Sequence, residues 1–549
     1  MKLDDKIIEK ILKKGSYVTD GDIEYAKKVQ SQHKGGSLID IIYSMNILTK
    51  DLFGQAVAEF HNLEYADLNS NLPKKEDVLK IPEAKYKSLN AVVFEIDDKK
   101  KKVTVAVSDP KKKDLKTNLQ AIFPKYSLKL KYALPEDIDD AKIYYHKSLD
   151  TRFEKLIKDD DAASKIIEEI FLDALVYKAS DIHFEPQENE IVIRFRVDGV
   201  LYQAGKIPKE NYETILNRLK IQAGLRIDEH DATQDGAIRF VSDGSIYDLR
   251  MSIVPIVTGE KVVIRVLSEY VRGYSLGDIG LSSEQSSMIM ESISKPIGMV
   301  LVTGPTGSGK TTTLYSILKL LNSPEKNITT IEDPVEYKLD GINQIQVNAR
   351  KDITFTKGIR SVVRQDPDII LVGEIRDRET SHLAVNAALT GHLLLSTFHA
   401  NNAATAIPRL LDMAVEPFLL SSTLDIVVSQ RLIRKLCENC RHSYTEKVSE
   451  LKKQNEEISK YFKGKEVTLY KSEGCASCNN LGYKGRTSIF EIIKITPEIK
   501  ELILSKPSAR EVWELAKTQN SKSMFEDGIR KVKTGITSLE ELLRVASPE

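Results

Sequence analysis

The spacing of hydrophobic residues changes several times along the chain, and each change marks a different kind of element. Between residues 7 and 12, isoleucine and leucine side chains fall on one helical face, which predicts a short amphipathic helix. Two similar stretches follow thirty residues apart, and in each a threonine, Thr19 or Thr49, is placed to cap a further helix. Residues 91–96 and 103–107 read as strands around a turn with four lysines. We therefore expect two small helical hairpins followed by a few strands.

The region from about residue 161 to residue 270 combines a helix with closely spaced strands. Apolar residues between 166 and 175 recur at helical spacing. The strands that follow are separated by Asp198-Gly199, Asp235-Gly236 and Asp243-Gly244, which we interpret as turns. Five arginines fall on this predicted sheet: Arg194, Arg196, Arg239, Arg250 and Arg265. Strand arginines usually form a solvated face, but they can also bind a polyphosphate.

Strands and helices alternate from about residue 280 onward, which is typical of a mostly parallel α/β sheet. Strands are expected at 299–302, 328–331, 368–372 and 393–395. Such sheets bind their ligands at the carboxyl ends of the strands. The polar residues that follow these strands should therefore surround one crevice.

A glycine-rich loop follows the first of these strands and leads into a helix expected over 312–321. The loop and the start of the helix comprise Gly304, Pro305, Thr306, Gly307, Ser308, Gly309, Lys310, Thr311 and Thr312. The backbone N–H groups of such a loop, together with the positive end of the helix, bind phosphate. We expect Lys310 to reach the β and γ oxygens of ATP and the Thr311 hydroxyl to bind Mg²⁺.

Carboxylates and histidines near the other strand ends are candidates for hydrolytic chemistry. Glu374 fits the acid that holds Mg²⁺, and Glu332 or Glu336 can polarise the attacking water. His392 or His399 can sense the γ-phosphate. Each of these residues alone is equally consistent with an ordinary polar residue at a strand end. Their joint occurrence after a phosphate-binding loop favours a nucleoside triphosphatase.

The four cysteines of the chain form two pairs, Cys437-x-x-Cys440 and Cys475-x-x-Cys478. Each pair spaces two thiolates for one tetrahedral ion, and two pairs complete a closed Cys₄ site. The alternative is a set of free thiols on a hairpin. We predict a structural zinc site.

Composition limits the classes of protein to consider. A chain of 549 residues is long enough for roughly three or four domains. The 80 basic and 80 acidic side chains cancel, so the chain as a whole has no field that would attract nucleic acid or anionic lipid. The sequence begins without a secretory signal and has no apolar run of the roughly 18 residues that a membrane span needs. We therefore expect a cytoplasmic protein.

Three segments resemble the motifs of the type II secretion and type IV pilus assembly ATPases. Residues 331–337 resemble the Asp box, residues 364–377 the Walker B region and residues 390–399 the His box. The likeness extends from about Ala162 to Val545. It implies a homo-hexameric ring that hydrolyses ATP and, through an inner-membrane platform protein, drives the assembly of pilin-like subunits. It also agrees with zinc, because assembly ATPases commonly carry a tetracysteine insert.

The resemblance implies a role for individual residues. Lys310 and Thr311 match the Walker A residues, Glu336 the proposed base and Glu374 the Walker B acid. The family's arginines that contact ATP match Arg250 and Arg265 in the N-terminal half of the motor and Arg360, Arg364 and Arg376 in the C-terminal half. A short connection at about 268–279 would let the first half close over the nucleotide. The loop with His230-Asp231-Ala232 departs from the family pattern, which leaves its role open.

Together these observations define the expected fold class, a multidomain chain with a small helical and α+β domain at its N-terminus. This partner-docking domain should occupy 1–147 and be followed by a linker at 148–160 and a PAS-like α+β domain at 161–270. Residues 271–549 should form a RecA-like α/β phosphate-loop ATPase domain with a Cys₄ zinc insert at 431–487 and a helical C-terminal region.

The resemblance also implies partners for the N-terminal domain. Such domains dock on the cytoplasmic partner of the platform protein, which would hold the motor at the inner face of the cytoplasmic membrane. Some of them bind cyclic di-GMP through a motif that starts with Arg-Leu-Gly. This chain has Lys34-Gly35-Gly36 in that region, so cyclic di-GMP binding is the less favoured alternative.

Two other functions stay open at this point. Ring-shaped phosphate-loop motors also move nucleic acid, but the neutral charge and the lack of an aromatic and basic channel pattern argue against direct nucleic-acid binding. A scaffold that binds ATP without hydrolysis is disfavoured by the intact Lys310, Glu336 and Glu374. Pilus extension, protein secretion and DNA uptake share this motor, so the sequence does not distinguish them. The sequence is also equally consistent with Arg250 and Arg265 contacting the ATP of their own chain or that of a neighbouring subunit.

Overall fold

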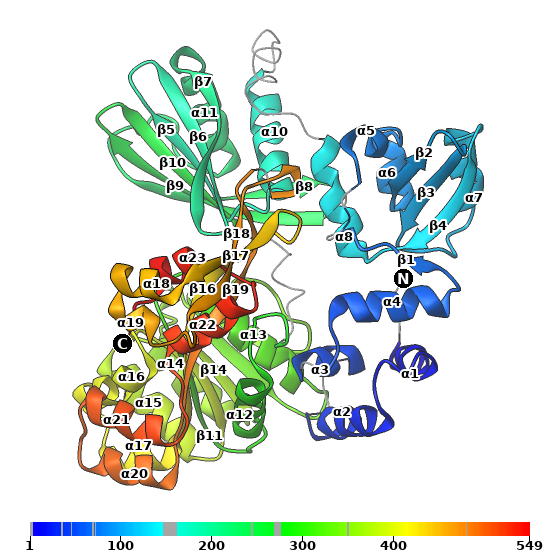
Figure 1. The fold of residues 1–549 in the computed structure, drawn as a ribbon. Helices are drawn as coiled ribbons and strands as arrows, with labels where there is room; N and C mark the ends of the chain where they lie inside the picture. Colours follow the sequence, from blue (N-terminus) through cyan, green and yellow to red (C-terminus); the bar gives the residue numbers. More distant parts are fainter. Residues whose placement is uncertain are drawn as a thin grey trace. The chain divides into compact units, whose positions relative to one another are not determined.

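The computed structural model describes residues 4–33, 37–45, 47–68, 71, 73–145, 162–242, 245–267, 276–348, 351–478 and 480–548. The chain divides into two compact units, residues 57–273 and residues 2–56 with 274–549, and each is described by itself (Figure 1). Several predicted features lie outside the described residues: the linker at 148–160, Lys34-Gly35-Gly36, Asp243-Gly244 and most of the connection at 268–279. The predicted domain boundaries stay predictions.

Four helices form the N-terminal segment: α1 (Asp5–Lys14), α2 (Asp20–His33), α3 (Leu38–Ser44) and α4 (Lys50–Phe60). The backbone N–H of Asp22 donates to the Thr19 hydroxyl at 3.1 Å, and that of Leu52 donates to the Thr49 hydroxyl at 3.3 Å. These contacts confirm both predicted caps. In α1, Ile7 is 37% exposed while the other three apolar residues of its face are buried, so the buried face is narrower than predicted.

Residues 57–145 build a four-stranded sheet in the order β1-β4-β3-β2. Its strands are β1 (Glu64–Tyr65), β2 (Ala91–Asp97), β3 (Lys102–Val107) and β4 (Ser127–Tyr132), and its helices are α5 (Lys75–Val78), α6 (Glu83–Leu89), α7 (Leu115–Ile122) and α8 (Pro135–Asp140). The two strands predicted around the lysine turn are confirmed as β2 and β3, which pair antiparallel. β4 runs parallel to β3, and α7 makes the crossover between them.

Residues 162–267 build a six-stranded antiparallel sheet in the order β7-β6-β5-β10-β9-β8. Its strands are β5 (Asp181–Pro186), β6 (Glu190–Val197), β7 (Val200–Pro208), β8 (Gln234–Ser242), β9 (Ser245–Ile256) and β10 (Gly259–Leu267), and its helices are α10 (Ala162–Val176) and α11 (Tyr212–Gln222). Both helices and one face of the sheet share a buried apolar core. The predicted turn at Asp198-Gly199 is confirmed, with φ values of 50° and 84°.

The predicted turn at Asp235-Gly236 is wrong. Both residues lie inside β8, where Asp235 pairs with Ser252 and Gly236 pairs with Met251 of β9. A side chain at position 236 would place its Cβ 2.6 Å from the backbone oxygen of Ala223, just after α11. Glycine is needed here because the strand passes close to the end of the helix, not because the chain turns.

The five arginines predicted on this sheet lie on one face. Arg265 of β10 is paired with Arg250 of β9 and with Asp181 of β5. Asp181 is in turn paired with Arg196 of β6. Because side chains alternate along a strand, the register puts the remaining two arginines on this same face, opposite the apolar core.

Residues 276–548 fold around a seven-stranded sheet in the order β13-β12-β14-β15-β11-β16-β19. Its strands are β11 (Gly298–Thr303), β12 (Ile328–Glu332), β13 (Asn343–Gln346), β14 (Ile369–Ile375), β15 (Leu393–Phe398), β16 (Leu424–Leu436) and β19 (Tyr483–Lys494). Its surrounding helices include α12 (Ser283–Ile293), α13 (Lys310–Leu321), α14 (Phe355–Val362), α15 (Arg378–Leu389), α16 (Ala403–Asp412) and α17 (Pro417–Thr423). Only the β16–β19 pair is antiparallel, which confirms the mostly parallel sheet.

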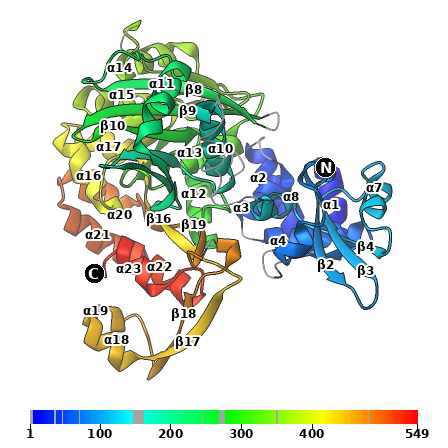
Figure 2. The same ribbon diagram turned by 90° about the horizontal axis from the view of Figure 1, so that it is seen from above.

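The chain leaves this sheet between β16 and β19. There β17 (Arg441–Lys447) and β18 (Glu466–Ser472) form a separate antiparallel pair, joined by α18 (Val448–Gln454) and α19 (Glu456–Ser459) (Figure 2). Four helices follow β19: α20 (Pro497–Leu504), α21 (Ala509–Thr518), α22 (Met524–Lys533) and α23 (Leu539–Val545). The last two share a buried apolar cluster with β16, β19 and the inserted elements, so the insert is tied to the helical C-terminal region.

Candidate active site and metal centre

The glycine-rich loop connects the end of β11 to the start of α13. β11 is completely buried between β15 and β16, so its carboxyl end is fixed in the middle of the sheet. Gly309 precedes α13 with a φ of 89°, a conformation that glycine adopts without strain. The helix begins at Lys310, and the N–H groups of its first turn therefore lie at the loop. This is the arrangement that binds an anion.

Lys310 folds back onto the loop that precedes it. Its ammonium group donates to the backbone oxygens of Gly304 and Pro305 at 2.8 and 2.9 Å. Burial lowers the pKa of Lys310, and the negative charge of Glu374 partly offsets this effect. A phosphate in the loop would offer this ammonium group a charged acceptor, which binds more strongly than a neutral carbonyl.

Gln430 of β16 supports the phosphate loop through hydrogen bonds of its side chain, a role that the sequence analysis did not predict. Its amide nitrogen donates to the backbone oxygen of Ser308 at 2.7 Å, and its amide oxygen accepts from the Thr313 hydroxyl at 2.7 Å. The side chain is completely buried. A Cβ on Gly304 would lie 2.5 Å from the backbone oxygen of Gln430, so the loop also contacts β16 directly. A glutamine within an apolar strand gives no local signal of this role.

Glu374 lies two strands away from the phosphate loop, because β15 separates β14 from β11 in the sheet. It belongs to β14, which extends to Ile375 and not only to residue 372 as predicted. Its carboxylate oxygen Oε2 is 2.6 Å from Nε of Arg376 and 3.4 Å from Nε2 of His399. The Glu374 side chain is 12% exposed, whereas Arg376 and His399 are 65% and 45% exposed. Three charged or titratable side chains from two neighbouring strand ends thus meet at one point.

The two glutamates at the end of β12 and just after it are placed differently. Glu332 is 3% exposed and accepts hydrogen bonds from the hydroxyl groups of Tyr315 and Thr330. It also accepts from the side-chain amide of Gln344 at 3.3 Å. Burial and the charge of Glu332 raise the pKa of Tyr315, whose oxygen accepts from the backbone N–H of Glu336 at 3.4 Å. Glu332 therefore anchors this segment, and Glu336, which is partly exposed, is the better candidate to activate water.

The two candidate histidines lie at opposite ends of β15. His392 directly precedes β15, and its backbone oxygen accepts from the N–H of Gly298, the first residue of β11. His399 directly follows β15, at the edge where β11 ends and the loop begins. A strand of this length spans roughly 17–20 Å. The structure does not bring His392 to the loop, and its ring Nδ1 lies 2.8 Å from the backbone oxygen of Ala387 instead.

The other predicted arginines are not gathered at Glu374. Arg360 of α14 pairs with Glu379 at 2.9 Å, and Arg364, after the same helix, donates to Ser361 at 3.5 Å. Arg250 and Arg265 belong to the unit of residues 57–273, described separately. The roles predicted for these four arginines stay predictions.

The four cysteines converge at the base of the insert. Cys437 follows β16, Cys475 and Cys478 precede β19, and all four sulfur atoms lie within 4.8 Å of one another. The Sγ atoms of Cys437 and Cys475 are 3.8 Å apart, as are those of Cys440 and Cys478. Four sulfurs at about 2.3 Å from a tetrahedral Zn²⁺ would be about 3.8 Å apart, whereas a disulfide needs about 2.05 Å.

The surroundings of the sulfurs also suit a metal-bound thiolate. Burial raises the pKa of the Cys437 thiol, so a charged sulfur at this position needs a cation beside it. Burial acts in the same direction on Cys478, but hydrogen bonds from the backbone N–H groups of Cys475 and Gly482 outweigh it and lower the pKa of Cys478. The four residues present therefore fit zinc in both spacing and donor chemistry.

The fold and the site together define a phosphate-loop ATPase with a RecA-like α/β core. The chain belongs to the type II/IV secretion system protein family, whose pattern matches residues 157–544. A second pattern, the MshEN domain, matches residues 61–146. The protein is thus an ATPase of the type II secretion and type IV pilus assembly class.

Two relatives agree with this assignment, and one solved structure agrees with the fold. The type II secretion system protein E of Pseudomonas aeruginosa is 44% identical over 392 residues, which cover 71% of this chain and 77% of the relative. The type IV pilus assembly ATPase PilB of Thermus thermophilus is 44% identical over 388 residues, which cover 70% of this chain but only 43% of the relative. The solved structure of the Legionella pneumophila ATPase DotB has 20% identity and a TM-score of 0.51, covers 69% of this chain and 94% of DotB, and supports the fold alone.

Proposed function

We propose that this protein is a homo-hexameric motor that uses ATP hydrolysis to drive the assembly of pilin-like subunits through an inner-membrane platform protein. The observation that carries the proposal is the meeting of Glu374, Arg376 and His399 at the loop edge of the sheet. It occurs in a chain 44% identical to a type IV pilus assembly ATPase. Pilus extension and protein secretion are both served by such a motor.

Each residue of the site has a role in the proposed reaction. The loop N–H groups and Lys310 bind the β and γ phosphates, and the Thr311 hydroxyl and the Glu374 carboxylate are the oxygen ligands that Mg²⁺ prefers. When bound, Mg²⁺ neutralises charge on the phosphates. Glu336 accepts a proton from the attacking water, while Arg376 and His399 contact the γ-phosphate.

Arg250 and Arg265 complete the site in the assembled ring. They lie side by side on a sheet face opposite the core, and Arg265 is 62% exposed although it contacts Asp181 at 3.3 Å. Guanidinium groups that meet a γ-phosphate in related enzymes accelerate hydrolysis by about 10³-fold or more. Arg360 and Arg364 would add contacts from the ATPase unit.

Mixing two inactive variants tests the ring. Lys310→Ala removes the phosphate contact, and Arg250→Ala removes the arginine. If the arginine acts on a neighbour's ATP, a mixture contains some interfaces with both groups intact, so partial ATPase activity should return. Arg239→Ala, on the same sheet face and 71% exposed, is the matched control and should keep its activity. A protein that hydrolyses ATP fully as a monomer would contradict the hexameric motor.

The Cys₄ cluster holds structural zinc in this proposal. Zinc there would fasten the insert of β17 and β18 to the ends of β16 and β19, far along the chain from the phosphate loop. Because all four ligands come from the protein, the metal has no open position for catalysis.

The N-terminal domain is the docking domain in this proposal. Among the described residues, no helix combines the length and apolar character needed to span a bilayer. We propose that the motor reaches the inner face of the cytoplasmic membrane through partners bound by residues 1–147. Deletion of these residues should remove the protein from isolated inner membranes while ATP hydrolysis persists. Equal membrane recovery after the deletion would contradict the docking role.

A further inference from the structure

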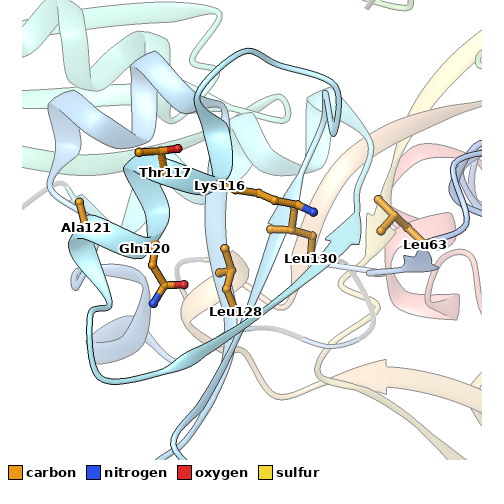
Figure 3. Close-up of a pocket in the computed structure, with 7 residues that line it drawn as sticks. All are labelled: Leu63, Lys116, Thr117, Gln120, Ala121, Leu128 and Leu130. Carbon is orange, nitrogen blue, oxygen red and sulfur yellow. The ribbon is translucent and has the colours of Figure 1, made fainter.

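A groove lies beside β4 in the four-stranded sheet of residues 57–145. It has a volume of about 780 Å³. On one side it is lined by three leucines, Leu63, Leu128 and Leu130, all partly exposed. On the other side α7 contributes the polar side chains of Lys116 and Gln120 (Figure 3). The groove therefore offers an apolar surface next to hydrogen-bonding groups.

The backbone of β4 is open along this groove. The N–H groups of Ser127 and Ala133 donate toward β3, whereas the oxygen of Tyr132 accepts from Ala66 on the β1 side. Because these directions alternate, the N–H and C=O groups of Leu128 and Leu130 point away from β3. β1 pairs only with residues 131 and 132, so in the described part of the chain no strand covers residues 127–130 on that side.

The two faces beside this open edge differ in chemistry. Leu128 and Leu130 lie on the face toward the groove. Lys129 and Lys131, at the alternate positions, lie on the opposite face. Residues 97–131 contain eleven lysines and only four aspartates, although the whole chain is neutral. The edge therefore favours a strand that is apolar on one face and acidic on the other.

β1 already shows this pairing within the chain. Leu63 lines the groove, and Glu64, the next residue, contacts both Lys129 and Lys131, the latter at 3.2 Å. β1 pairs only with the last two residues of β4, so the four residues before them, 127–130, have no partner strand on that side in the described part of the chain. The residues of β1 that pair with the end of β4 therefore indicate the chemistry of an occupant for the rest of the edge.

We propose that the open edge of β4 binds an extended segment of a partner protein in which apolar and acidic residues alternate. The segment adds to the sheet as a strand, its apolar side chains enter the groove beside Leu128 and Leu130, and its carboxylates face the lysines. A flat bilayer surface would meet the lysines but not the recessed leucines, which favours a protein segment over anionic lipid. The inference rests on the docking role proposed above and specifies its site.

The test uses the full-length protein and labelled nine-residue peptides. One peptide alternates valine with glutamate and the other alternates valine with lysine; binding is measured by fluorescence anisotropy. Only the first should bind, and more weakly as salt increases. Lys129→Glu should weaken it about five- to tenfold, because an attractive pair becomes repulsive. Lys99→Glu, on the exposed β2–β3 turn, makes the same change in net charge away from the edge and should leave binding within about twofold of wild type.

Two further variants separate the groove from general charge. Leu128→Pro removes an N–H group that points to the open edge. Thr117 of α7 also lines the groove, and Thr117→Phe fills it. Both variants should abolish peptide binding while ATP hydrolysis stays at the wild-type rate. The proposal would be overturned if Lys99→Glu and Lys129→Glu lost peptide affinity equally. It would also be overturned if the protein bound phosphatidylglycerol vesicles and not the peptide. If the deletion of 1–147 abolishes membrane recovery but the peptide does not bind, docking stands and this site is wrong.

Discussion

Gln430 offers the sharpest test of how β16 supports the phosphate loop. Substitution of this residue with alanine removes a donor to the Ser308 backbone and an acceptor for the Thr313 hydroxyl. Both contacts are 2.7 Å long and completely buried on the Gln430 side. No side chain that touches nucleotide is changed, so any loss of binding must come from the loop's conformation.

The magnitude follows from the two contacts. A buried polar group left without a partner costs about 1–3 kcal/mol, so the loss of both contacts should cost the variant about 2–6 kcal/mol of stability around the loop. About 1.4 kcal/mol corresponds to a tenfold change in a binding constant. We expect roughly a third to a half of this lost free energy to destabilise the ordered conformation of the loop that binds ATP. ATP should then bind about 10-fold more weakly.

A fluorescent nucleotide titration and a thermal unfolding curve together measure this effect. Gln430→Ala should bind nucleotide more weakly and unfold at a lower temperature than wild type. Gln519→Ala is the control, because the Gln519 side chain is also hydrogen-bonded, to Thr496 and Glu498, but lies far along the chain from the loop. Wild-type nucleotide affinity in Gln430→Ala would refute the idea that this residue orders the loop.

Three further predictions follow from particular side chains. His399→Ala should reduce ATP turnover at least tenfold and His392→Ala should not, because only His399 lies at the loop edge beside Glu374; equal turnover in both would contradict the placement. Burial lowers the pKa of Lys531 to about 8, partly offset by Asp527. Between pH 8 and 10 the Lys531 side chain therefore keeps its proton in the unfolded chain but has released it in the folded chain. Urea unfolding should show that the stability of wild type rises over that range relative to Lys531→Met. Parallel stability curves for the two proteins would contradict the lowered pKa. The purified protein should hold about one zinc per chain. Cys475→Ser should lose the zinc and unfold locally between residues 437 and 478 while still binding nucleotide. A metal assay that finds no zinc in the wild-type protein would refute the zinc site.

The sequence predicted best what depends on neighbouring residues. The loop at 304–311 and the two cysteine pairs are contiguous motifs, and the structure places them as their spacing requires. Gln430 could not be predicted, because the residue it supports, Ser308, lies 122 positions away. Only the packing of β16 against β11 brings them together.

Other differences have equally local physical reasons. Asp235-Gly236 resembled a turn because glycine after aspartate is typical of one, whereas the close approach of Ala223 explains the glycine. His392 and His399 are seven residues apart with one strand between them, so they had to lie at opposite ends of that strand. Their separation follows from the sequence, because an extended strand of six residues lies between them.

The most direct test of the central claim is ATP hydrolysis and nucleotide binding by Lys310→Ala and Glu374→Gln, measured on the same assembled protein. Lys310→Ala should lose both, because the ammonium group contacts the phosphates in the bound and the reacting state. Glu374→Gln should bind ATP with nearly wild-type affinity but hydrolyse it at least about 100-fold more slowly, because the amide keeps the shape and removes the charge. Hydrolysis by Glu374→Gln at the wild-type rate would contradict the assignment of this site as the source of the motor's energy.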